Sequence, residues 1–295
     1  MKLDKLIRKG TSPWLPGGGT IEQELTEMAC IESVCYAGRT KHIRAYYSAK
    51  YNDGKLTGQK EKRTKRGKPT SEKQAEINRK HSLRILTWIM DANFSGADLY
   101  VTYSFAKDKR PGDPKKFRAC VKQFLKQLRK IYRNAGVILK YIWVGERGER
   151  GAEHIHMVQS GGIDIRCLKI AWPHGWINVV PMDESGSYHK LASYFIEYSD
   201  KTMRTEGRLQ GKRYNPSQNL VRPEPEKDKV NKSRRIDPGA IKVPKGYYLD
   251  KESVQSGIQE NDYEFLEYTL VLLPGYYIAA HERAVRRQGR KKRSR

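Results

Sequence analysis

The hydrophobic residues of this chain follow two different periods between residues 99 and 134. In Leu-Tyr-Val-Thr-Tyr-Ser-Phe (99–105) the side chains alternate in character, which predicts a strand with Thr102 and Ser104 on one face. Over 114–134 apolar residues recur at spacings of three and four, so we expect an amphipathic helix there. Lys and Arg fill the other face of this helix.

The segments that follow continue this mixed pattern. We expect strands at 138–146, 153–160 and 176–182, and helices at 165–171 and 187–198. An earlier helix is expected to run from Thr70 or Ser71, either of which can cap it, to about Ala92. After that helix the order is strand, helix, strand, strand, helix, strand, helix, which is the split β-α-β plan. The predicted fold class is therefore α+β, an antiparallel sheet with helices on one face.

Composition divides the chain into four parts. Residues 1–70 are predicted to form a basic, loosely structured extension, because Pro and Gly interrupt it early and Lys and Arg crowd its end. Residues 71–220 hold the α+β domain. Residues 221–281 form a C-terminal segment that is first polar and then alternates as two further strands would. Residues 282–295 form a basic tail.

The balance of charge indicates a polyanionic partner. The 295 residues include 58 Lys and Arg against 33 Asp and Glu, a formal net charge of +25. No apolar run approaches the roughly 20 residues that cross a bilayer, so nucleic acid, and not a membrane, is the expected partner. The amino terminus lacks the apolar core of a secretory signal, and the four cysteines form no disulfide framework. A cytoplasmic protein with reduced thiols is expected.

Two histidines separated by one apolar residue are the first candidate for chemistry. On a strand, His154 and His156 point to the same face, while Ile155 points into the core. If the preceding strand pairs with this one through a hairpin, Glu146 returns beside them. Two imidazoles and a carboxylate suit a catalytic divalent ion. A pair of this kind also occurs in strands without a metal, and a structural zinc site lacks nearby cysteine partners.

Two tyrosines and a lysine are the second candidate. Tyr194 and Tyr198 are four residues apart, and Lys201 follows three residues later, so a helix places all three on one face. A phenol is a weak nucleophile at neutral pH because its pKa is about 10. It can attack a phosphodiester when cations neutralise the charge that builds on the phosphate. The alternative is that the tyrosines lie at the edge of the core, as tyrosines on amphipathic helices often do.

Together these motifs resemble those of the HUH-superfamily rolling-circle replication initiators, the Rep endonucleases of plasmids, phages and small circular single-stranded DNA viruses. The strand 99–105 is similar to the family's first motif, and His154-Ile-His156 to its second. The segment from Tyr194 to Lys201 resembles the third, and Glu146 the acidic metal ligand of viral Reps. The resemblance covers about residues 80–220 and looks closest to plasmid and phage Reps.

The resemblance implies a function as well as a fold. Family members nick single-stranded DNA at a replication origin: a tyrosine becomes joined to the 5′ end, and the freed 3′ hydroxyl primes replication. Mg²⁺ or Mn²⁺, held by Glu146, His154 and His156, would polarise the phosphate, and Lys201 would assist. Residues expected to contact DNA lie in the first motif and in the two basic segments: Thr102, Ser104, Lys62, Arg63, Lys65, Arg66, Arg290, Lys291, Lys292 and Arg293. The segment 60–68 is equally compatible with a solvated linker.

Several alternatives stay open at this point. Either tyrosine can be the nucleophile; the Leu-Ala-x-Tyr pattern favours Tyr194, whereas the lysine follows Tyr198 at the family spacing. A transposase or relaxase would use the same chemistry. A non-catalytic binder with an RNA-recognition-like sheet would instead stack bases on Tyr100 and Tyr103. Because no Walker-type phosphate loop is present, unwinding would need a partner helicase from the host.

Overall fold

The computed structural model describes residues 28–48, 51–52, 55–56, 71–148, 151–203, 209–230, 236–259 and 262–290. They fall into two compact units. The first draws on residues 1–35, 41–67 and 225–277, and the second on 36–40, 68–224 and 278–295. No helix in the described ranges is both long and apolar enough to cross a membrane.

The first unit is built on an antiparallel sheet with the strand order β10-β1-β2-β12-β11. Its strands are β1 (Ala29–Ala37), β2 (Thr40–Ser48), β10 (Glu226–Lys229), β11 (Tyr247–Ile258) and β12 (Glu264–Leu272). Two short strands, β3 (Tyr51–Asn52) and β4 (Lys55–Leu56), pair separately. The two strands that the sequence predicts after residue 245 are present as β11 and β12.

The prediction of a loosely structured extension over residues 1–70 is wrong for residues 29–48, which form two strands. The segments Ala-Cys-Ile-Glu-Ser-Val-Cys-Tyr-Ala and Thr-Lys-His-Ile-Arg-Ala-Tyr-Tyr-Ser are rich in the β-branched and aromatic residues that strands favour. A short connection joins them at Gly38, whose φ of 55° suits glycine. The prolines and glycines at the start of the chain drew attention away from this alternation.

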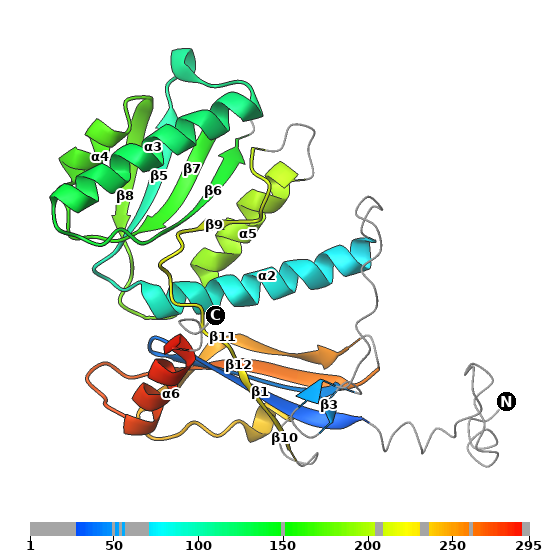
Figure 1. Ribbon diagram of the computed structural model, residues 1–295. Coiled ribbons are helices and arrows are strands. Elements are labelled where there is room, and N and C mark those ends of the chain that lie inside the picture. Colours follow the sequence, from blue (N-terminus) through cyan, green and yellow to red (C-terminus); the bar gives the residue numbers. More distant parts are fainter. Residues whose placement is uncertain are drawn as a thin grey trace, which may run out of the picture. The chain divides into compact units, whose positions relative to one another are not determined.

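The second unit contains the split β-α-β sheet, with strand order β8-β5-β7-β6-β9. The α+β class is confirmed, and the elements follow in the predicted order (Figure 1). Its strands are β5 (Leu99–Phe105), β6 (Tyr141–Arg147), β7 (Glu153–Gln159), β8 (Gly175–Pro181) and β9 (Asn215–Pro216). Its helices are α2 (Glu72–Asn93), α3 (Pro114–Asn134), α4 (Ile165–Ala171), α5 (His189–Met203) and α6 (Ala279–Arg290).

The helix ends follow from local sequence. Ser71 caps α2 by accepting a hydrogen bond from the backbone N–H of Gln74 at 3.3 Å. Asp113 caps α3, with Pro114 at the first helical position, where its missing N–H costs nothing. Gly136 follows α3 with a φ of 69°, in the left-handed region that commonly ends helices.

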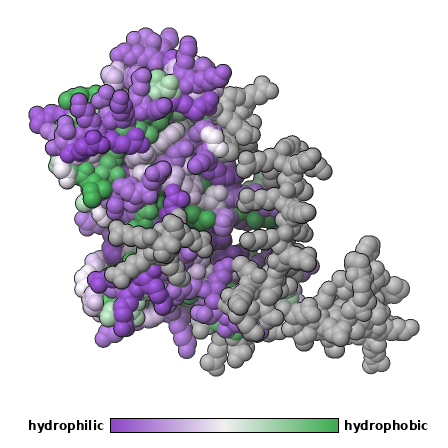
Figure 2. Space-filling model, viewed as in Figure 1, coloured by the Kyte–Doolittle hydropathy of each residue, from purple (hydrophilic) through white to green (hydrophobic). Residues whose placement is uncertain are grey.

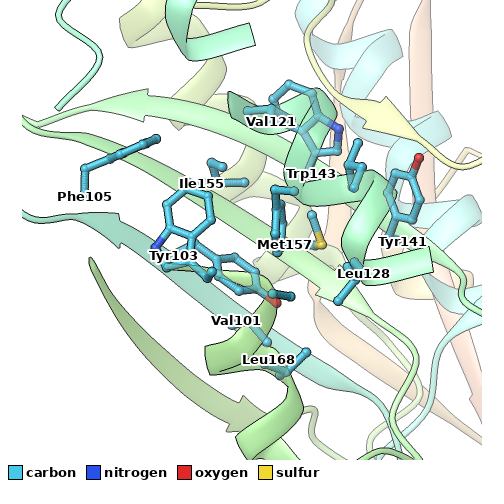
Figure 3. Packing of buried hydrophobic residues seen from close by; sticks show 14 of the residues in the cluster. Val101, Tyr103, Phe105, Val121, Leu128, Tyr141, Trp143, Ile155, Met157 and Leu168 are labelled. Atoms are coloured by element: carbon cyan, nitrogen blue, oxygen red, sulfur yellow. The ribbon is translucent and has the colours of Figure 1, made fainter. Parts of the chain in front are cut away.

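Helices cover both faces of this sheet, whereas the sequence predicted helices on one face. On one side, α3 and α4 pack against the odd-numbered residues of β5 and β7, among them Tyr103, Ile155 and Met157 (Figures 1 and 3). On the other side, α2 and α5 pack against Ile142 and Val144 of β6. The reason is that β6 and β7 are apolar on both faces, as in strands buried on both sides. As a result α5 lies on the face that carries the histidines.

Leu128 tests the core beneath α3. Its side chain is fully buried among the aromatic residues of that cluster, so Leu128→Ala should lower the free energy of unfolding by about 2–5 kcal/mol. Urea denaturation of the two proteins measures the change. The neighbouring Gln127 is exposed on the same helix, and Gln127→Ala should change the free energy of unfolding by less than about 0.5 kcal/mol. Equal effects of the two changes would contradict this packing.

Candidate functional site

Three adjacent strands bring the predicted metal-binding residues together. In the antiparallel ladders Glu146 lies opposite His154. On the other side of β7, Ser104 lies opposite His154 and Thr102 opposite His156. Because alternate residues of a strand share a face, all five side chains lie on the same side of the sheet. This is the placement that the hairpin argument from the sequence predicted.

His156 is the centre of the cluster and is 6% exposed. Its Nε2 lies 2.8 Å from a carboxylate oxygen of Glu146. A carboxylate can only accept, so Nε2 carries the proton and Nδ1 is free to accept. Nδ1 lies 2.8 Å from the hydroxyl of Tyr100 and 3.3 Å from that of Thr102. Hydroxyls can donate or accept, so these partners fit either tautomer of the ring.

His154 is held in a similar way. Its Nδ1 lies 2.9 Å from the hydroxyl of Ser104, and the centres of the two imidazole rings are 6.4 Å apart. Partial burial, reinforced by the neighbouring His156, lowers the pKa of His154. A neutral imidazole with one nitrogen held by a hydroxyl is the form in which histidine binds a metal.

The carboxylate is tuned by the same neighbours. The hydrogen bond from His156 holds the pKa of Glu146 below its usual value, and the charge of Lys201 acts in the same direction. The ammonium of Lys201 lies 3.9 Å from the second carboxylate oxygen, and its side chain is 67% exposed. Glu146 is thus ionised at neutral pH, while Lys201 keeps most of its surface open to solvent or to a substrate.

The helix α5 places Tyr198 directly on the histidine cluster. Its ring stacks on that of His156, with ring centres 4.1 Å apart and planes 11° from parallel. Burial, followed by the charge of Glu146, raises the pKa of Tyr198. Its hydroxyl also interacts with that of Tyr100, whose own pKa burial raises to about 12. In this arrangement both phenols stay protonated at neutral pH.

Tyr194, the tyrosine that the sequence pattern favoured, lies one turn earlier on α5 and is 45% exposed. Its neighbours Phe195 and Ile196 are fully buried and fix the rotation of the helix against the sheet. The structure therefore brings Tyr198 into contact with His156 and leaves Tyr194 on the surface of α5.

The donor set fits a divalent ion, although no group of three or more His, Cys, Asp or Glu among the described residues already converges on one point. Glu146 and His156 are in contact, and their separation of 2.8 Å is close to the ~3 Å between neighbouring ligands of an octahedral ion with bonds of about 2.1 Å. His154 stands apart from that pair. The metal site stays a prediction, with Glu146, His154 and His156 as its ligands.

The same face of the sheet is open over β8. Trp176, Asn178 and Val180 alternate along this strand, and all three are exposed. Trp176 is 69% exposed and lies opposite Ser104, the residue that holds His154. Two strand spacings of about 4.8 Å separate Trp176 from His154. A large exposed indole beside a polar cluster is a natural platform for an unpaired base.

The residues predicted to contact DNA have different outcomes. Thr102 and Ser104 hydrogen-bond to the imidazoles, a role that the sequence did not predict for them. Arg290 ends α6. Lys62, Arg63, Lys65, Arg66, Lys291, Lys292 and Arg293 lie outside the described residues.

Two residues of this face, Tyr100 and Trp176, were not predicted as part of the metal and tyrosine site. For Tyr100 the signal was available, because it alternates with Thr102 and Ser104 on the same strand. The exposure of Trp176 depends on which strands the helices leave uncovered, and no local pattern reveals that.

The fold and the site together define an α+β domain in which a histidine–carboxylate cluster faces a tyrosine carried by a helix. Residues 98–203 match the family model of the replication-associated protein ORF2. The matched range contains every residue of the cluster and both tyrosines. Neither the comparison with curated proteins nor that with solved structures found a match. The family match indicates a function in DNA replication.

The hydroxyls that hold the imidazoles can be tested by metal binding. Ser104→Ala removes the partner of His154, and Tyr100→Phe removes the closer partner of His156. We expect each change to weaken Mn²⁺ binding about 10- to 100-fold, as losses of partners that orient metal ligands commonly do. Isothermal titration calorimetry measures the affinity.

Tyr103→Phe is the matched control for the hydroxyl changes, because Tyr103 lies on the same strand but its hydroxyl bonds to Gln159 on the other face. It should leave the Mn²⁺ affinity unchanged. If Ser104→Ala and Tyr100→Phe bind Mn²⁺ as tightly as the parent protein, these hydroxyls do not support a metal site.

Proposed function

We propose that this protein initiates rolling-circle replication as a metal-dependent endonuclease that nicks single-stranded origin DNA. One observation carries the proposal: within the range that matches a replication-associated family, a tyrosine ring stacks on His156, whose Nε2 contacts Glu146. This arrangement places a phenol, two imidazoles, a carboxylate and an ammonium around one point. These groups are sufficient for the transfer of a phosphodiester to tyrosine.

The proposed reaction exchanges one phosphodiester for another. The phenol oxygen attacks the scissile phosphorus, and the bond from phosphorus to the 3′ oxygen of the preceding nucleotide breaks. The 5′ end of the DNA stays joined to the tyrosine. The phenol gives up one proton and the departing 3′ oxygen takes one up, which leaves a 3′ hydroxyl as primer.

Each residue of the cluster has a part in this reaction. Glu146, His154 and His156 would hold Mg²⁺ or Mn²⁺, and the ion would neutralise charge on the phosphate and favour the phenolate. Lys201, exposed at the edge of the cluster, would bind a non-bridging phosphate oxygen. Tyr100, Thr102 and Ser104 keep the imidazoles in place through their hydroxyls.

Tyr198 is the nucleophile that the geometry favours. Its ring already contacts His156, and Lys201 lies 5.9 Å from the centre of the same ring. Tyr194 is four residues earlier and more exposed. An initiator with two tyrosines at this spacing can use one for the first nick and the other for the closing transfer. Tyr194 is then available for the second step.

The competing function of a binder without catalysis loses one of its two stacking residues. Tyr103 is fully buried beneath α3 and α4, with its ring packed on Phe124 and Trp172, so it cannot stack a base. A transposase or relaxase would share the chemistry proposed here, but the family match is to a replication-associated protein.

Covalent capture tests the proposed nucleophile. The protein is incubated with single-stranded oligonucleotides and Mn²⁺, and adducts that survive denaturation are detected by electrophoresis. Tyr198→Phe should reduce the first nick by at least about 100-fold, Tyr194→Phe should reduce it by less than about 10-fold, and the double variant should form no adduct. EDTA should abolish the adduct and excess Mn²⁺ should restore it.

Tyr188→Phe serves as a control for the loss of a phenol, because this tyrosine is buried and bonds to the backbone of Asp183. It should retain adduct formation. Nicking by the double variant Tyr194→Phe/Tyr198→Phe would overturn the mechanism. Full activity in EDTA would overturn the metal-dependent part of it.

Trp176 tests the path of the single strand across the sheet. Trp176→Ala should raise the KM for single-stranded DNA about 5- to 150-fold, which corresponds to the loss of one stacked base. Trp176→Phe should restore much of the affinity, since a smaller ring still stacks. Ile170→Ala is the control, because Ile170 is 76% exposed on α4, which covers the other face. An unchanged KM for Trp176→Ala would place the DNA elsewhere.

A further inference from the structure

The exposed face of α3 is strongly cationic. The helix contains no Asp or Glu but eight exposed Lys and Arg residues: Lys115, Lys116, Arg118, Lys122, Lys126, Arg129, Lys130 and Arg133. From Arg118 to Arg133, five of them recur every three or four residues and so form one row. At about 1.5 Å per residue this row is roughly 22 Å long. Figure 2 shows hydrophilic residues over much of the visible face of this unit.

A pocket opens beside this row, between α3, β6 and the segment that leads into β9. Its volume is about 270 Å³. Val121, Leu125 and Trp143 give it an apolar lining, and Trp143 lies next to α3 in the core (Figure 3). The polar part of its wall comes from Arg118, Lys122, Arg129, Gln210 and Asn215. A second hollow, of about 440 Å³, continues along α3 and is lined by Lys126, Gln127, Arg129, Lys130 and Arg133.

The polar wall of the pocket is fixed. Gln210 is 2% exposed, accepts a hydrogen bond from the backbone N–H of Gly145 at 2.8 Å, and donates to the carbonyl of Arg213 at 3.1 Å. Arg129 donates to the hydroxyl of Tyr141 at 2.7 Å. The pocket therefore has a preformed shape, as binding sites for small planar groups usually do.

The chemistry of this surface selects an unpaired nucleotide. A duplex presents phosphates and groove edges, and an apolar pocket containing an indole offers it little. An unpaired base has an exposed π-face that can enter such a pocket, while the phosphates on either side of it need cations. Here the cations of α3 border the apolar opening.

The position of the pocket connects it to the cluster around His156. Trp143 and Glu146 belong to the same strand, three residues apart, and therefore face opposite sides of the sheet. Along the strand they are about 10 Å apart, which is on the order of three nucleotides at about 3.4 Å each. A single strand that leaves the cluster at the β6 edge of the sheet can reach the pocket within a few nucleotides.

We propose that the pocket at Trp143 binds one unpaired base of single-stranded DNA and that the cationic row of α3 binds the phosphates that follow it. This would hold the strand next to the nick on the sheet face opposite the tyrosines. The proposal relies on the proposed function only for the choice of single-stranded DNA as ligand.

Gly211 offers a way to fill the pocket without disturbing the fold. It lines the pocket, and a Cβ added to it would meet nothing within 4 Å. Gly211→Phe should therefore place a ring in the opening, while Gly211→Ala should leave it accessible. Both variants are made in the background Tyr194→Phe/Tyr198→Phe, so that binding is measured without cleavage.

Fluorescence anisotropy then measures binding of oligonucleotides in which each nucleotide in turn is abasic. In the parent protein and in Gly211→Ala, one position beyond that of Trp176 should weaken binding about 5- to 150-fold, the range for one stacked base. In Gly211→Phe that position should lose its effect. An abasic profile that is the same in Gly211→Phe and Gly211→Ala would overturn the pocket assignment.

The salt dependence of binding tests the cationic row. Lys122→Gln/Lys126→Gln should make the slope of log affinity against log salt concentration shallower by about 1.4, that is about 0.7 for each phosphate that is no longer neutralised. Lys73→Gln/Lys80→Gln removes the same charge from exposed positions on α2 and should change the slope by less than half as much. Equal changes for the two pairs would mean that α3 contributes only general charge.

The two proposals can fail separately. Nicking is followed in a protein with both tyrosines intact, on an oligonucleotide too short to reach the pocket, and Gly211→Phe should not affect it. If nicking is absent but the abasic position still depends on Gly211, the pocket stands and the nickase does not. Tighter binding of duplex than of single strand, equally reduced by Lys122→Gln/Lys126→Gln, would overturn the proposed ligand.

Discussion

The pairing of β5 with β7 is the constraint on which the site depends. It sets Ser104 opposite His154 and Thr102 opposite His156, and the side-chain hydroxyls then reach the ring nitrogens across the strands. A slip of one residue would turn every one of these side chains to the other face. The buried odd-numbered residues of β5, among them Tyr103 and Phe105, prevent that slip because they cannot be exposed without loss of the core.

The two faces of the sheet have different tasks. One face is closed by α3 and α4 and holds most of the aromatic core, including Tyr103, Phe124 and Trp172. The other is covered only partly, by α2 and α5, and stays open over β8. The position of α5 on this second face brings Tyr198 onto His156. A helix confined to the first face could not have delivered a tyrosine to the cluster.

Much of the fold and of the cluster follows from the sequence. Strand alternation placed the histidines together, the hairpin brought Glu146 back to them, and helical spacing put Tyr194, Tyr198 and Lys201 on one face of α5. These inferences succeed because each depends on a local period or on one short connection. Other features depend on packing between distant segments and were missed. The choice of Tyr198 over Tyr194 as the ring that contacts His156 depends on the rotation of α5, which Phe195 and Ile196 fix by burial. The pocket at Trp143 requires Gln210 and Asn215, which no motif connects to α3.

The sheet of the first unit is assembled from segments on either side of the second unit. Strands β1 and β2 leave the ribosome early, but β10 and β12, which pair with them, begin only at Glu226 and Glu264. At a synthesis rate of about 5–20 residues per second, that gap of roughly 190 residues or more lasts on the order of 10–40 s. The split β-α-β sheet, whose strands β5 to β8 are contiguous in the chain, has time to form during this wait. The nascent chain therefore carries a hairpin with two unsatisfied edges for many seconds, which is the state in which strands most readily pair with the wrong neighbour.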